Sequence, residues 1–323
     1  MPNLLILTEV QEAMRARYKA MLLERFPQLT IHVVGHHNDV GPYIASTDIL
    51  LCFSPPMADH VVRDAPRLKW IQALGTGVDN IVDLPSLGKE VVVTNIRGIH
   101  GAPVSEATIA YMFSLARDMP HSTRAQDKSD WQRWPARLLT GKTVGILGVG
   151  LIAEYLAPIC KAFGMTVIGI SGAPRSAPGF DRMVVRQDLL KVAPDFDFLV
   201  ALAPLTPETR GIVGAKLLAA MKPSAFLINV ARGGVVDEPA LIEALEAGRI
   251  AGAALDVFSE EPLPPDSPLW KAKNITIFPH LGGYSEGYED RAMPTIAGNM
   301  ARFLNNDLKN MINIVRKPAS WGN

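Results

Sequence analysis

Residues 143–153 read TVGILGVGLIA, and this stretch decides the fold. An apolar run that suits a buried strand enters a Gly-x-Gly-x-x-Ala turn, and a helical run leaves it. Gly148 permits the tight turn, Gly150 leaves the backbone open to close approach, and Ala153 lets helix and strand pack closely. With a second strand at Thr166–Ile170, this order is typical of a unit that binds a dinucleotide pyrophosphate at a helix N-terminus.

Short apolar strands and helical segments alternate on both sides of this turn. Before it we expect strands at Leu4–Leu7, Leu29–Val34, Ile49–Phe53, Leu68–Ala73 and Glu90–Thr94, with helices at Gln11–Phe26 and Val104–Met119. After it we expect strands at Thr166–Ile170, Phe198–Leu202, Phe226–Val230, Gly252–Val257 and Ile275–Phe278, with helices at Leu151–Phe163, Lys216–Met221, Glu238–Ala247 and Tyr288–Leu304.

This alternation predicts an α/β protein with two doubly wound parallel-sheet domains, Rossmann-like or flavodoxin-like, and a cleft between them. The first strand-to-helix turn, Thr8–Val10, contains no glycine. We therefore place the dinucleotide in the second half of the chain. Pro158 lies inside the helix that follows the glycine turn, where we expect it to remove one backbone donor and kink the helix.

Composition excludes several classes of function. The 323 residues are 48% hydrophobic and 20% charged with a formal net charge of zero, which argues against nucleic acid or an anionic membrane as the partner. No apolar run approaches the roughly 20 residues of a membrane span, and Met1–Leu7 lacks the features of a signal peptide. We therefore expect a cytoplasmic protein, with Cys52 and Cys160 as buried free thiols and no metal site.

Three polar residues follow apolar strands of the second half: Arg232, Glu261 and His280. Because open α/β sheets bind ligands at the carboxyl ends of their strands, we expect the three side chains to share one crevice. Taken singly, each has an ordinary explanation as a surface ion pair, a solvated loop acid or a structural histidine. Glycines beside them, Gly233-Gly234 and Gly282-Gly283, favour close approach by a ligand.

The three side chains suit hydride transfer to a 2-oxo acid. Arg232 offers a planar fork of donors to a carboxylate and the neighbouring carbonyl oxygen. His280 as imidazolium delivers the proton to that oxygen, and Glu261 favours the charged ring and holds its orientation. A nicotinamide cofactor supplies the hydride, while the protein supplies placement.

Several motifs resemble the D-isomer-specific 2-hydroxyacid dehydrogenases. They are Leu74–Asn80 (LGTGVDN), Asn229–Gly234 (NVARGG), Leu255–Phe258 with Glu261-Pro262, and Pro279–Gly282 (PHLG), and the likeness spans essentially the whole chain in order and spacing. The resemblance implies that Arg232 binds and polarises the substrate, that His280 is the acid/base, and that Glu261 pairs with it. Glu260 competes for that role, but the residue directly before the proline matches the family pattern.

The resemblance also implies a discontinuous substrate domain, 1–98 plus 287–323, and a dinucleotide-binding domain, 99–286. Substrate contacts fall on Leu74, Gly75, Thr76, Gly77, Arg232 and His280, where the Gly75–Gly77 loop offers backbone N–H groups to the carboxylate. Cofactor contacts fall on Thr76, Gly148, Gly150, Leu151, Ile152, Ser171, Arg175, Ala203, Pro204, Val230, Arg232, Asp256 and His280, with Asp256 near the nicotinamide carboxamide. Val230, Ala203 and Leu151 suit core packing equally well.

The end of the second strand bears on the choice of coenzyme. An acid there binds the ribose 2′-OH of NAD, but this strand ends in Ser171-Gly172-Ala173-Pro174-Arg175. Ser171 and Arg175 suit a 2′-phosphate, so the sequence predicts NADP(H) in preference to NAD(H). The alternative is a dual enzyme in which Arg175 is a solvated loop cation.

The family likeness favours a small 2-oxo acid such as glyoxylate or hydroxypyruvate, and a homodimer. A bulkier 2-oxo acid stays open, because Tyr284-Ser285-Glu286 departs from the small residues common after the family histidine. A different class also stays open, since corepressor-type relatives use this fold to sense nucleotides. Arg232, Glu261 and His280 together favour an enzyme. The roles of His100 and Tyr284 are left undecided.

Overall fold

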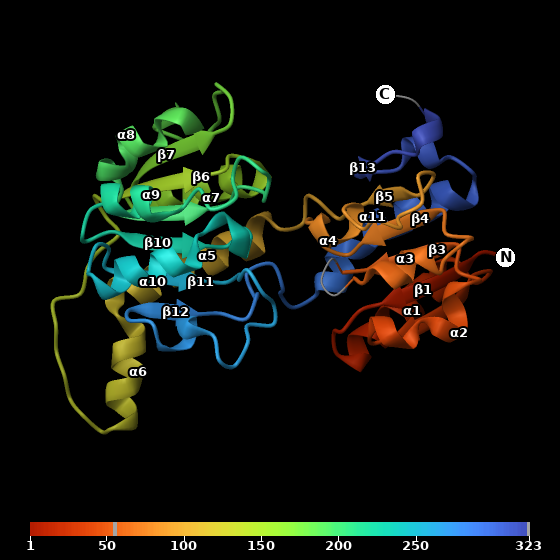
Figure 1. The fold of residues 1–323 in the computed structure, drawn as a ribbon, viewed down its shortest axis with the longest axis horizontal. Helices are drawn as coiled ribbons and strands as arrows, with labels where there is room; N and C mark the ends of the chain where they lie inside the picture. The colour runs from red at the N-terminus through yellow and green to blue at the C-terminus, as the bar shows by residue number, and fades with distance from the viewer. Residues whose placement is uncertain (54–56, 322–323) are drawn as a thin grey trace. The chain divides into compact units, whose positions relative to one another are not determined.

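The computed structural model describes residues 1–53 and 57–321, and the chain divides into two compact α/β units (Figure 1). The first unit comprises Met1–Ile99 and Glu286–Asn323, and the second comprises His100–Ser285. Each is built around one sheet of mostly parallel strands.

The first unit holds a six-stranded sheet in the order β13-β5-β4-β3-β1-β2. Its elements are β1 (Asn3–Leu7), α1 (Glu12–Arg25), β2 (Thr30–Val34), α2 (Gly41–Ile44), β3 (Ile49–Cys52), α3 (Asp59–Arg63), β4 (Trp70–Ala73), α4 (Asp79–Val82), β5 (Val92–Thr94), α11 (Tyr288–Leu304) and β13 (Ile314–Arg316). Among the described strands of this unit, β13 alone pairs antiparallel to its neighbour. This is the flavodoxin-like arrangement of a doubly wound sheet.

Alternation along β1 shows how this unit is layered. Leu4 and Ile6 point to the face covered by α1 and α11, whereas Leu5 and Leu7 point to the face covered by α2, α3 and α4. All four side chains are buried, because a parallel sheet with helices on both faces leaves neither face to water.

The second unit holds a seven-stranded parallel sheet in the order β12-β11-β10-β9-β6-β7-β8. Its elements are α5 (Gly101–Arg117), α6 (Met119–Asp127), β6 (Thr143–Leu147), α7 (Leu151–Ala162), β7 (Thr166–Ser171), β8 (Arg182–Val185), α8 (Leu189–Val192), β9 (Phe198–Ala201), α9 (Ala215–Ala220), β10 (Phe226–Asn229), α10 (Glu238–Glu246), β11 (Gly252–Leu255) and β12 (Ile275–Ile277). Helices α5 and α7 cover one face, and α8, α9 and α10 cover the other. The strand order reverses between β6 and β9, which is the switch point of a Rossmann sheet.

The expected doubly wound α/β fold is confirmed, as is the final helix, which spans Tyr288–Leu304. Cys52 and Cys160 are both buried and free, and burial raises the pKa of the Cys160 thiol to about 12. Helix α7 continues through Pro158 to Ala162. The sequence missed α6, β8 and β13, which are short or at an edge and carry a weak periodic signal.

The described parts of the chain hold neither a membrane-spanning helix nor a cluster of metal-binding side chains. Within residues 1–53 and 57–321, no helix is both long and apolar enough to cross a bilayer. Across the same residues, no group of three or more His, Cys, Asp or Glu side chains is placed to hold a metal ion.

Candidate active site

The glycine turn after β6 lies at the switch point of the second sheet. Gly148 has φ +101°, and a Cβ there would lie 2.4 Å from the backbone nitrogen of Ala203 after β9. Gly148 is therefore required both for its left-handed backbone and for the close approach of the two loops. At Gly150, the residue before α7, no described atom lies within 4 Å of the position of a Cβ. The open backbone before a helix N-terminus fits a dinucleotide pyrophosphate.

A hollow of about 310 Å³ surrounds this turn. Its lining includes five of the expected cofactor residues, namely Gly148, Ser171, Arg175, Ala203 and Pro204. Leu151 and Ile152 form the first turn of α7, and the Val230 N–H donates to the carbonyl of Ala201 at 3.3 Å. Residues expected from the sequence to contact the cofactor therefore line one hollow beside the glycine turn.

Ser171 and Arg175, the two residues expected to suit a 2′-phosphate, both make contacts within the protein. The Ser171 hydroxyl donates to the carbonyl of Ala173 at 2.6 Å. The Arg175 guanidinium donates to the carbonyl of Val149 at 2.7 Å and pairs with Glu154 of α7 at 2.6 Å. Glu154 competes with a phosphate for this cation, although a partly exposed ion pair contributes little free energy and exchanges readily.

Arg186 lines the same hollow and was missed from the sequence. It directly follows β8, and its guanidinium Nη1 lies 3.8 Å from the position of a Cβ on Gly172. The pKa of Glu208 is lowered mainly by the Thr206 hydroxyl, and the charge of the Arg186 guanidinium adds to this effect. An arginine directly after a strand could have indicated this residue, but the sequence analysis did not recognise β8 as a strand.

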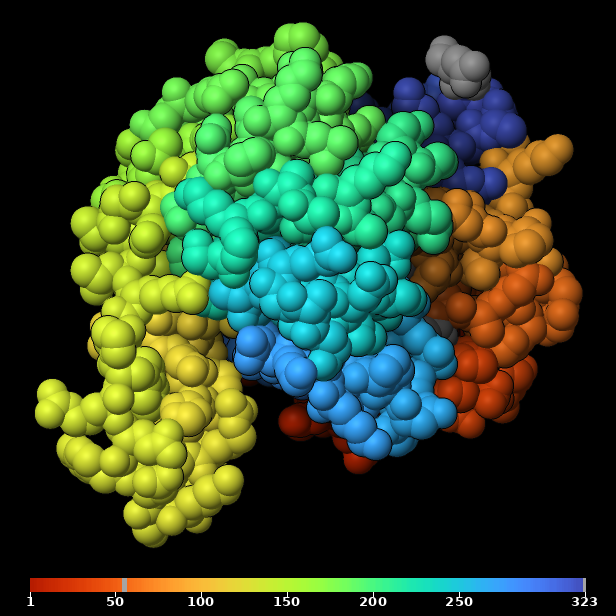
Figure 2. Space-filling model, turned by 60° about the vertical axis from the view of Figure 1, so that its left-hand side comes forward, coloured from red at the N-terminus to blue at the C-terminus, as the bar shows by residue number. Residues whose placement is uncertain are grey.

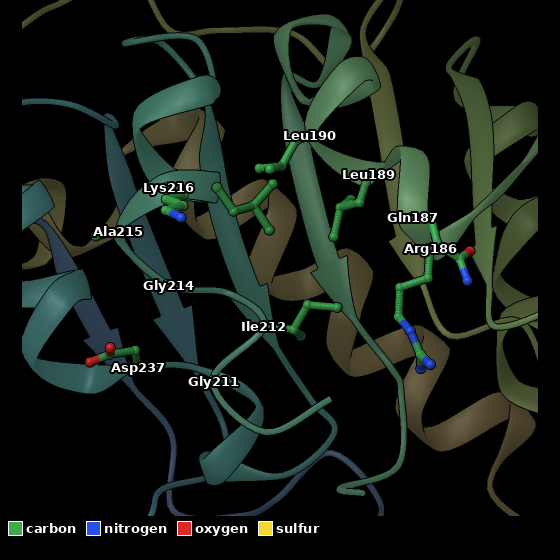
Figure 3. A pocket seen from close by; sticks show the side chains of 11 residues that line it. Arg186, Gln187, Leu189, Leu190, Gly211, Ile212, Gly214, Ala215, Lys216 and Asp237 are labelled. Atoms are coloured by element: carbon green, nitrogen blue, oxygen red, sulfur yellow. The ribbon is translucent and has the colours of Figure 1, made fainter. Parts of the chain in front are cut away.

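A second hollow, of about 460 Å³, adjoins the first at Arg186 (Figure 3). Figure 3 shows Arg186 and Asp237 at opposite ends of it, with Ile212 between them. Of the site residues expected from the sequence, its lining contains none. We therefore do not include it in the candidate site.

Glu261 and His280 form the central contact of the candidate catalytic site. His280 Nδ1 lies 2.6 Å from Glu261 Oε2, and the other carboxylate oxygen accepts the backbone N–H of Phe258 at 2.8 Å. The sequence left Glu260 as a competitor, but it is Glu261 that contacts the imidazole. An ionised carboxylate only accepts, so Nδ1 carries the proton and Nε2 is the nitrogen that remains for a substrate.

The surroundings of Glu261 keep it ionised. Burial is the largest effect on this carboxyl and by itself raises the pKa. The hydrogen bond and charge of His280 act in the opposite direction, helped by the Phe258 N–H and the charge of Arg232. The net result is a pKa for Glu261 below its usual value, which preserves the anionic partner of the imidazole.

Arg232 follows β10 in an extended conformation and is half-buried. Its Nη1 donates to the carbonyl of Ala231 at 2.7 Å. The buried Asn229 closes the turn before it, because Asn229 Nδ2 donates to the Arg232 carbonyl and Asn229 Oδ1 accepts the Ala231 N–H. Asn229 is thus a positioning residue that the sequence did not single out, although an asparagine at a strand end is a known turn former.

Three of the glycines beside these residues allow close packing within the protein, an explanation that the sequence did not offer. A Cβ on Gly233 would lie 1.8 Å from the carbonyl carbon of Phe258, so the Arg232 loop and the Glu261 loop touch through this glycine. A Cβ on Gly282 would lie 2.7 Å from Asp256 Oδ2, and one on Gly283 would lie 3.2 Å from a ring carbon of His100. Close packing between loops accounts for all three.

The turn that carries His280 is held by Asp256. The Asp256 side chain accepts the backbone N–H groups of Leu281 and Gly282 at 2.8 Å each, and its carbonyl accepts that of His280 at 2.9 Å. His280 itself has φ +54°, an uncommon conformation that needs such support. Asp256 therefore acts on the backbone here, a role distinct from the expected contact with the nicotinamide carboxamide.

The Gly75–Gly77 loop belongs to the first unit and follows β4. The carbonyls of Leu74, Gly75 and Thr76 accept the Tyr288 hydroxyl, the Ile96 N–H and the Asn95 side chain respectively. Because each peptide is planar and trans, the N–H groups of Gly75, Thr76 and Gly77 point away from these donors. This arrangement fits an anion-binding loop.

The sequence left the roles of His100 and Tyr284 undecided, and the structure shows what lies near each. His100 begins the second unit and is buried beside Gly283. The Tyr284 side chain is 39% exposed, and its backbone N–H donates to the carbonyl of Leu281. His100 therefore packs against the turn that carries His280.

Comparison with known proteins gives a consistent result. The family model for the NAD-binding domain of D-isomer specific 2-hydroxyacid dehydrogenases matches residues 109–282. A glyoxylate reductase of Korarchaeum cryptofilum is 32% identical over 265 residues, which cover 80% of each chain. The NADPH-dependent glyoxylate/hydroxypyruvate reductase of Sinorhizobium meliloti, solved with NADP and sulfate, superposes with a TM-score of 0.82 at 27% identity over 98% of both chains.

A D-3-phosphoglycerate dehydrogenase of Methanocaldococcus jannaschii is 35% identical over 280 residues, or 85% of this chain and 53% of that one. The chain thus spans about half the length of the phosphoglycerate dehydrogenases that it matches. The matched dinucleotide-binding domain covers more than half of the chain and includes the glycine turn, Arg232, Glu261 and His280. The chain therefore belongs to the D-isomer-specific 2-hydroxyacid dehydrogenase family.

Proposed function

We propose that this protein reduces a small 2-oxo acid to the D-2-hydroxy acid with a nicotinamide coenzyme. The observation that carries the proposal is the 2.6 Å contact between Glu261 and His280, with Arg232 close enough for its charge to act on Glu261. An imidazole held by an ionised carboxylate is a suitable proton donor.

Each residue has a defined role in this proposal. Arg232 binds the substrate carboxylate and polarises the carbonyl oxygen through its fork of donors. His280 Nε2 delivers a proton to that oxygen, while Glu261 holds the Nδ1 proton and balances the imidazolium charge. Backbone N–H groups of Gly75, Thr76 and Gly77 contribute to binding the carboxylate. The bound nicotinamide supplies the hydride to the carbonyl carbon.

Glyoxylate or hydroxypyruvate is the substrate that we propose. The names of the Korarchaeum cryptofilum and Sinorhizobium meliloti relatives support this choice. The phosphoglycerate dehydrogenases are equally similar in sequence, so 3-phosphohydroxypyruvate is the competing substrate to be tested. A bulkier 2-oxo acid is a further alternative, because the half-exposed Tyr284 stands four residues after His280.

NADP(H) is the preferred coenzyme in our proposal, with NAD(H) as the weaker alternative. Ser171 occupies the end of β7, where an NAD enzyme carries an acid, and two arginines line the adjoining hollow. Arg186 supplies the guanidinium, and Arg175 adds a second one if it exchanges Glu154 for phosphate. The Sinorhizobium meliloti structure with NADP supports the preference.

We assign dinucleotide binding to residues 99–286 and substrate binding largely to 1–98 with 287–323. We also propose a homodimer formed through α6 and the extended segment after it, which project from the sheet of the second unit (Figures 1 and 2). Trp131 is 90% exposed and Leu138 is 62% exposed on this projection. Large apolar side chains on a projecting segment suit burial against a second copy. Sedimentation velocity tests this, since a monomer at all concentrations would contradict it.

The experiment that tests the function is an initial-rate screen of glyoxylate, hydroxypyruvate, 3-phosphohydroxypyruvate and bulkier 2-oxo acids with NADPH and NADH. We expect turnover with the smallest acids and a higher kcat/KM with NADPH. His280→Asn should abolish turnover while coenzyme binding, followed by NADPH fluorescence, persists. Unchanged turnover in His280→Asn would refute the proton-donor role, and a clear NADH preference would overturn the coenzyme proposal. Coenzyme binding without turnover of any 2-oxo acid would favour a nucleotide-sensing module.

A further inference from the structure

Tyr111 connects helix α5 to the turn that carries His280. Its hydroxyl donates to Asp256 Oδ1 at 2.8 Å, and both residues are buried, with 5% and 2% of their surfaces exposed. The same Asp256 carboxylate accepts the N–H groups of Leu281 and Gly282. One tyrosine hydroxyl therefore completes the hydrogen bonding of a buried carboxylate that fixes the two residues after the histidine.

The ring of Tyr111 reaches the other side of the same turn. It stacks on Phe278, two residues before His280, with 3.9 Å between ring centroids and 20° between planes. The side chain is thus in contact with the chain before the histidine and, through Asp256, with the chain after it. Such double support matters because His280 holds a left-handed conformation with φ +54°.

The Tyr111 hydroxyl stays protonated and so always donates its hydrogen bond. Burial raises the pKa of Tyr111, and the nearby charge of Asp256 and its hydrogen bond raise it further. The phenol therefore keeps its proton at any working pH and donates steadily to the carboxylate. A buried carboxylate that loses one of its donors is costly, and its remaining partners must shift to compensate.

We propose that Tyr111 is a positioning residue for the acid/base histidine, acting through Asp256 and the Leu281–Gly282 turn on the angle at which His280 meets Glu261. The inference rests on the proposed function for its kinetic consequence, but its geometric consequence is independent of activity. Without the Tyr111 hydroxyl, the turn relaxes and the His280–Glu261 hydrogen bond loses its fixed geometry. Arg232 and the Gly75–Gly77 loop are not changed.

Two variants of α5 separate positioning from stability. Tyr111→Phe keeps the ring that stacks on Phe278 and removes only the hydroxyl. Thr108→Val removes another buried hydroxyl of the same helix, one that donates to the carbonyl of Val104. Both variants lose a buried hydrogen bond, but only the first should affect the histidine.

The first readout is proton NMR of protein labelled with ¹⁵N-histidine. The Nδ1 proton of His280, hydrogen-bonded to Glu261, should give a downfield resonance that disappears in His280→Asn. We expect this resonance to be broadened or lost in Tyr111→Phe and unchanged in Thr108→Val. The second readout is kinetic: in Tyr111→Phe, kcat should fall about tenfold while the KM for coenzyme stays within about twofold.

Three results would contradict the positioning role of Tyr111 or separate it from the proposed function. A Tyr111→Phe protein that keeps the resonance and the wild-type pH profile, or loses only melting temperature as Thr108→Val does, would overturn the inference. If the wild type reduces no 2-oxo acid, the proposed function fails, but the NMR comparison still decides the role of Tyr111. If Tyr111→Phe does not fold, Phe278→Leu, which removes the stacked ring and keeps the hydroxyl, should broaden the same resonance, and an unchanged resonance there would contradict the proposal.

Discussion

Glu261 uses its two carboxylate oxygens differently: one meets His280 Nδ1 at 2.6 Å, and the other is anchored by the backbone N–H of Phe258 at 2.8 Å. The anchor prevents the carboxylate from rotating away when the imidazole changes charge. Because the His280 side chain is 44% exposed and that of Glu261 only 22%, the pair presents the imidazole to solvent and keeps the acid behind it.

Replacing Glu261 by Gln tests this arrangement. Gln retains an oxygen that accepts from Phe258 but presents an N–H donor to Nδ1, so the charge that favours the imidazolium is lost. We expect kcat/KM to fall about 10- to 100-fold. Initial rates at a fixed pH measure this effect.

Glu260→Gln provides the matched control, since Glu260 is exposed and directly precedes Glu261. Its kinetic profile should coincide with that of the wild type. If both variants behaved alike, the pairing of Glu261 with the histidine would have no catalytic significance.

Arg186 provides a prediction about coenzyme choice. It lines the hollow at the end of β7, whereas Arg175 is already paired with Glu154. Arg186→Gln should therefore raise the Kd for NADPH about 10- to 100-fold, as expected for one charge-assisted contact to phosphate, and leave the Kd for NADH nearly unchanged. Fluorescence titration with each coenzyme measures the two constants.

Arg182→Gln, at the start of the same strand, is the control for loss of a positive charge. Arg182 is exposed, with a carboxylate oxygen of Asp195 at 3.8 Å, and does not line the hollow. An equal loss of NADPH and NADH affinity in Arg186→Gln would show that Arg186 supports the fold and not the 2′-phosphate.

The sequence was most informative where the place of a side chain depends on one neighbouring strand. Arg232, Glu261 and His280 lie in the loops after β10, β11 and β12, and parallel strands bring their carboxyl ends to one edge of the sheet. Gly148 was predictable for the same reason, because a strand followed by a tight turn and a helix is a local pattern.

What the sequence could not give were contacts between distant residues. Tyr111 and Asp256 are separated by 145 positions, and no local pattern distinguishes Tyr111 from the other apolar residues of its helix. Arg186 was missed because β8 is four residues long and has only one fully buried side chain. Gly233 was recognised as a close-approach position, but spacing cannot tell whether a ligand or Phe258 fills the space.

Gly233 leads to a prediction about stability and activity together. An added Cβ would lie 1.8 Å from the carbonyl carbon of Phe258, so one of the two loops must move. Gly233→Ala should lower the apparent melting temperature by about 5–10 °C, as expected for overpacking against backbone. Turnover should fall as well, because the loops that carry Arg232 and Glu261 separate. Differential scanning fluorimetry and initial rates test both.

Gly41→Ala is the corresponding control. Gly41 begins α2, its φ lies outside the left-handed region, and no described atom lies within 4 Å of the position of its Cβ. This variant should melt within about 2 °C of the wild type. If Gly233→Ala melted at the same temperature as Gly41→Ala, this result would contradict the close contact between Gly233 and Phe258.

His37 predicts how the first unit responds to acid. Burial lowers the pKa of His37 most strongly, the neighbouring His36 and His60 lower it further, and Glu9 and Asp39 oppose them. The ring centroids of His36 and His37 are 4.0 Å apart, and those of His37 and His60 are 5.2 Å apart. A histidine whose pKa is lower in the folded state stabilises the fold only while it is neutral.

Neutral His37 therefore contributes fully to the free energy of unfolding above its unfolded-state pKa of about 6.5. This contribution is lost as the pH falls through the lower pKa of the folded state. The melting temperature of the wild type should decline from pH 8 to pH 5. The decline should be smaller in His37→Gln, because this variant has no imidazole to protonate beside His36 and His60. His121→Gln, at a half-buried histidine of the second unit far from this cluster in the sequence, should leave the decline unchanged. A wild-type decline retained in full by His37→Gln would assign the acid sensitivity to other groups.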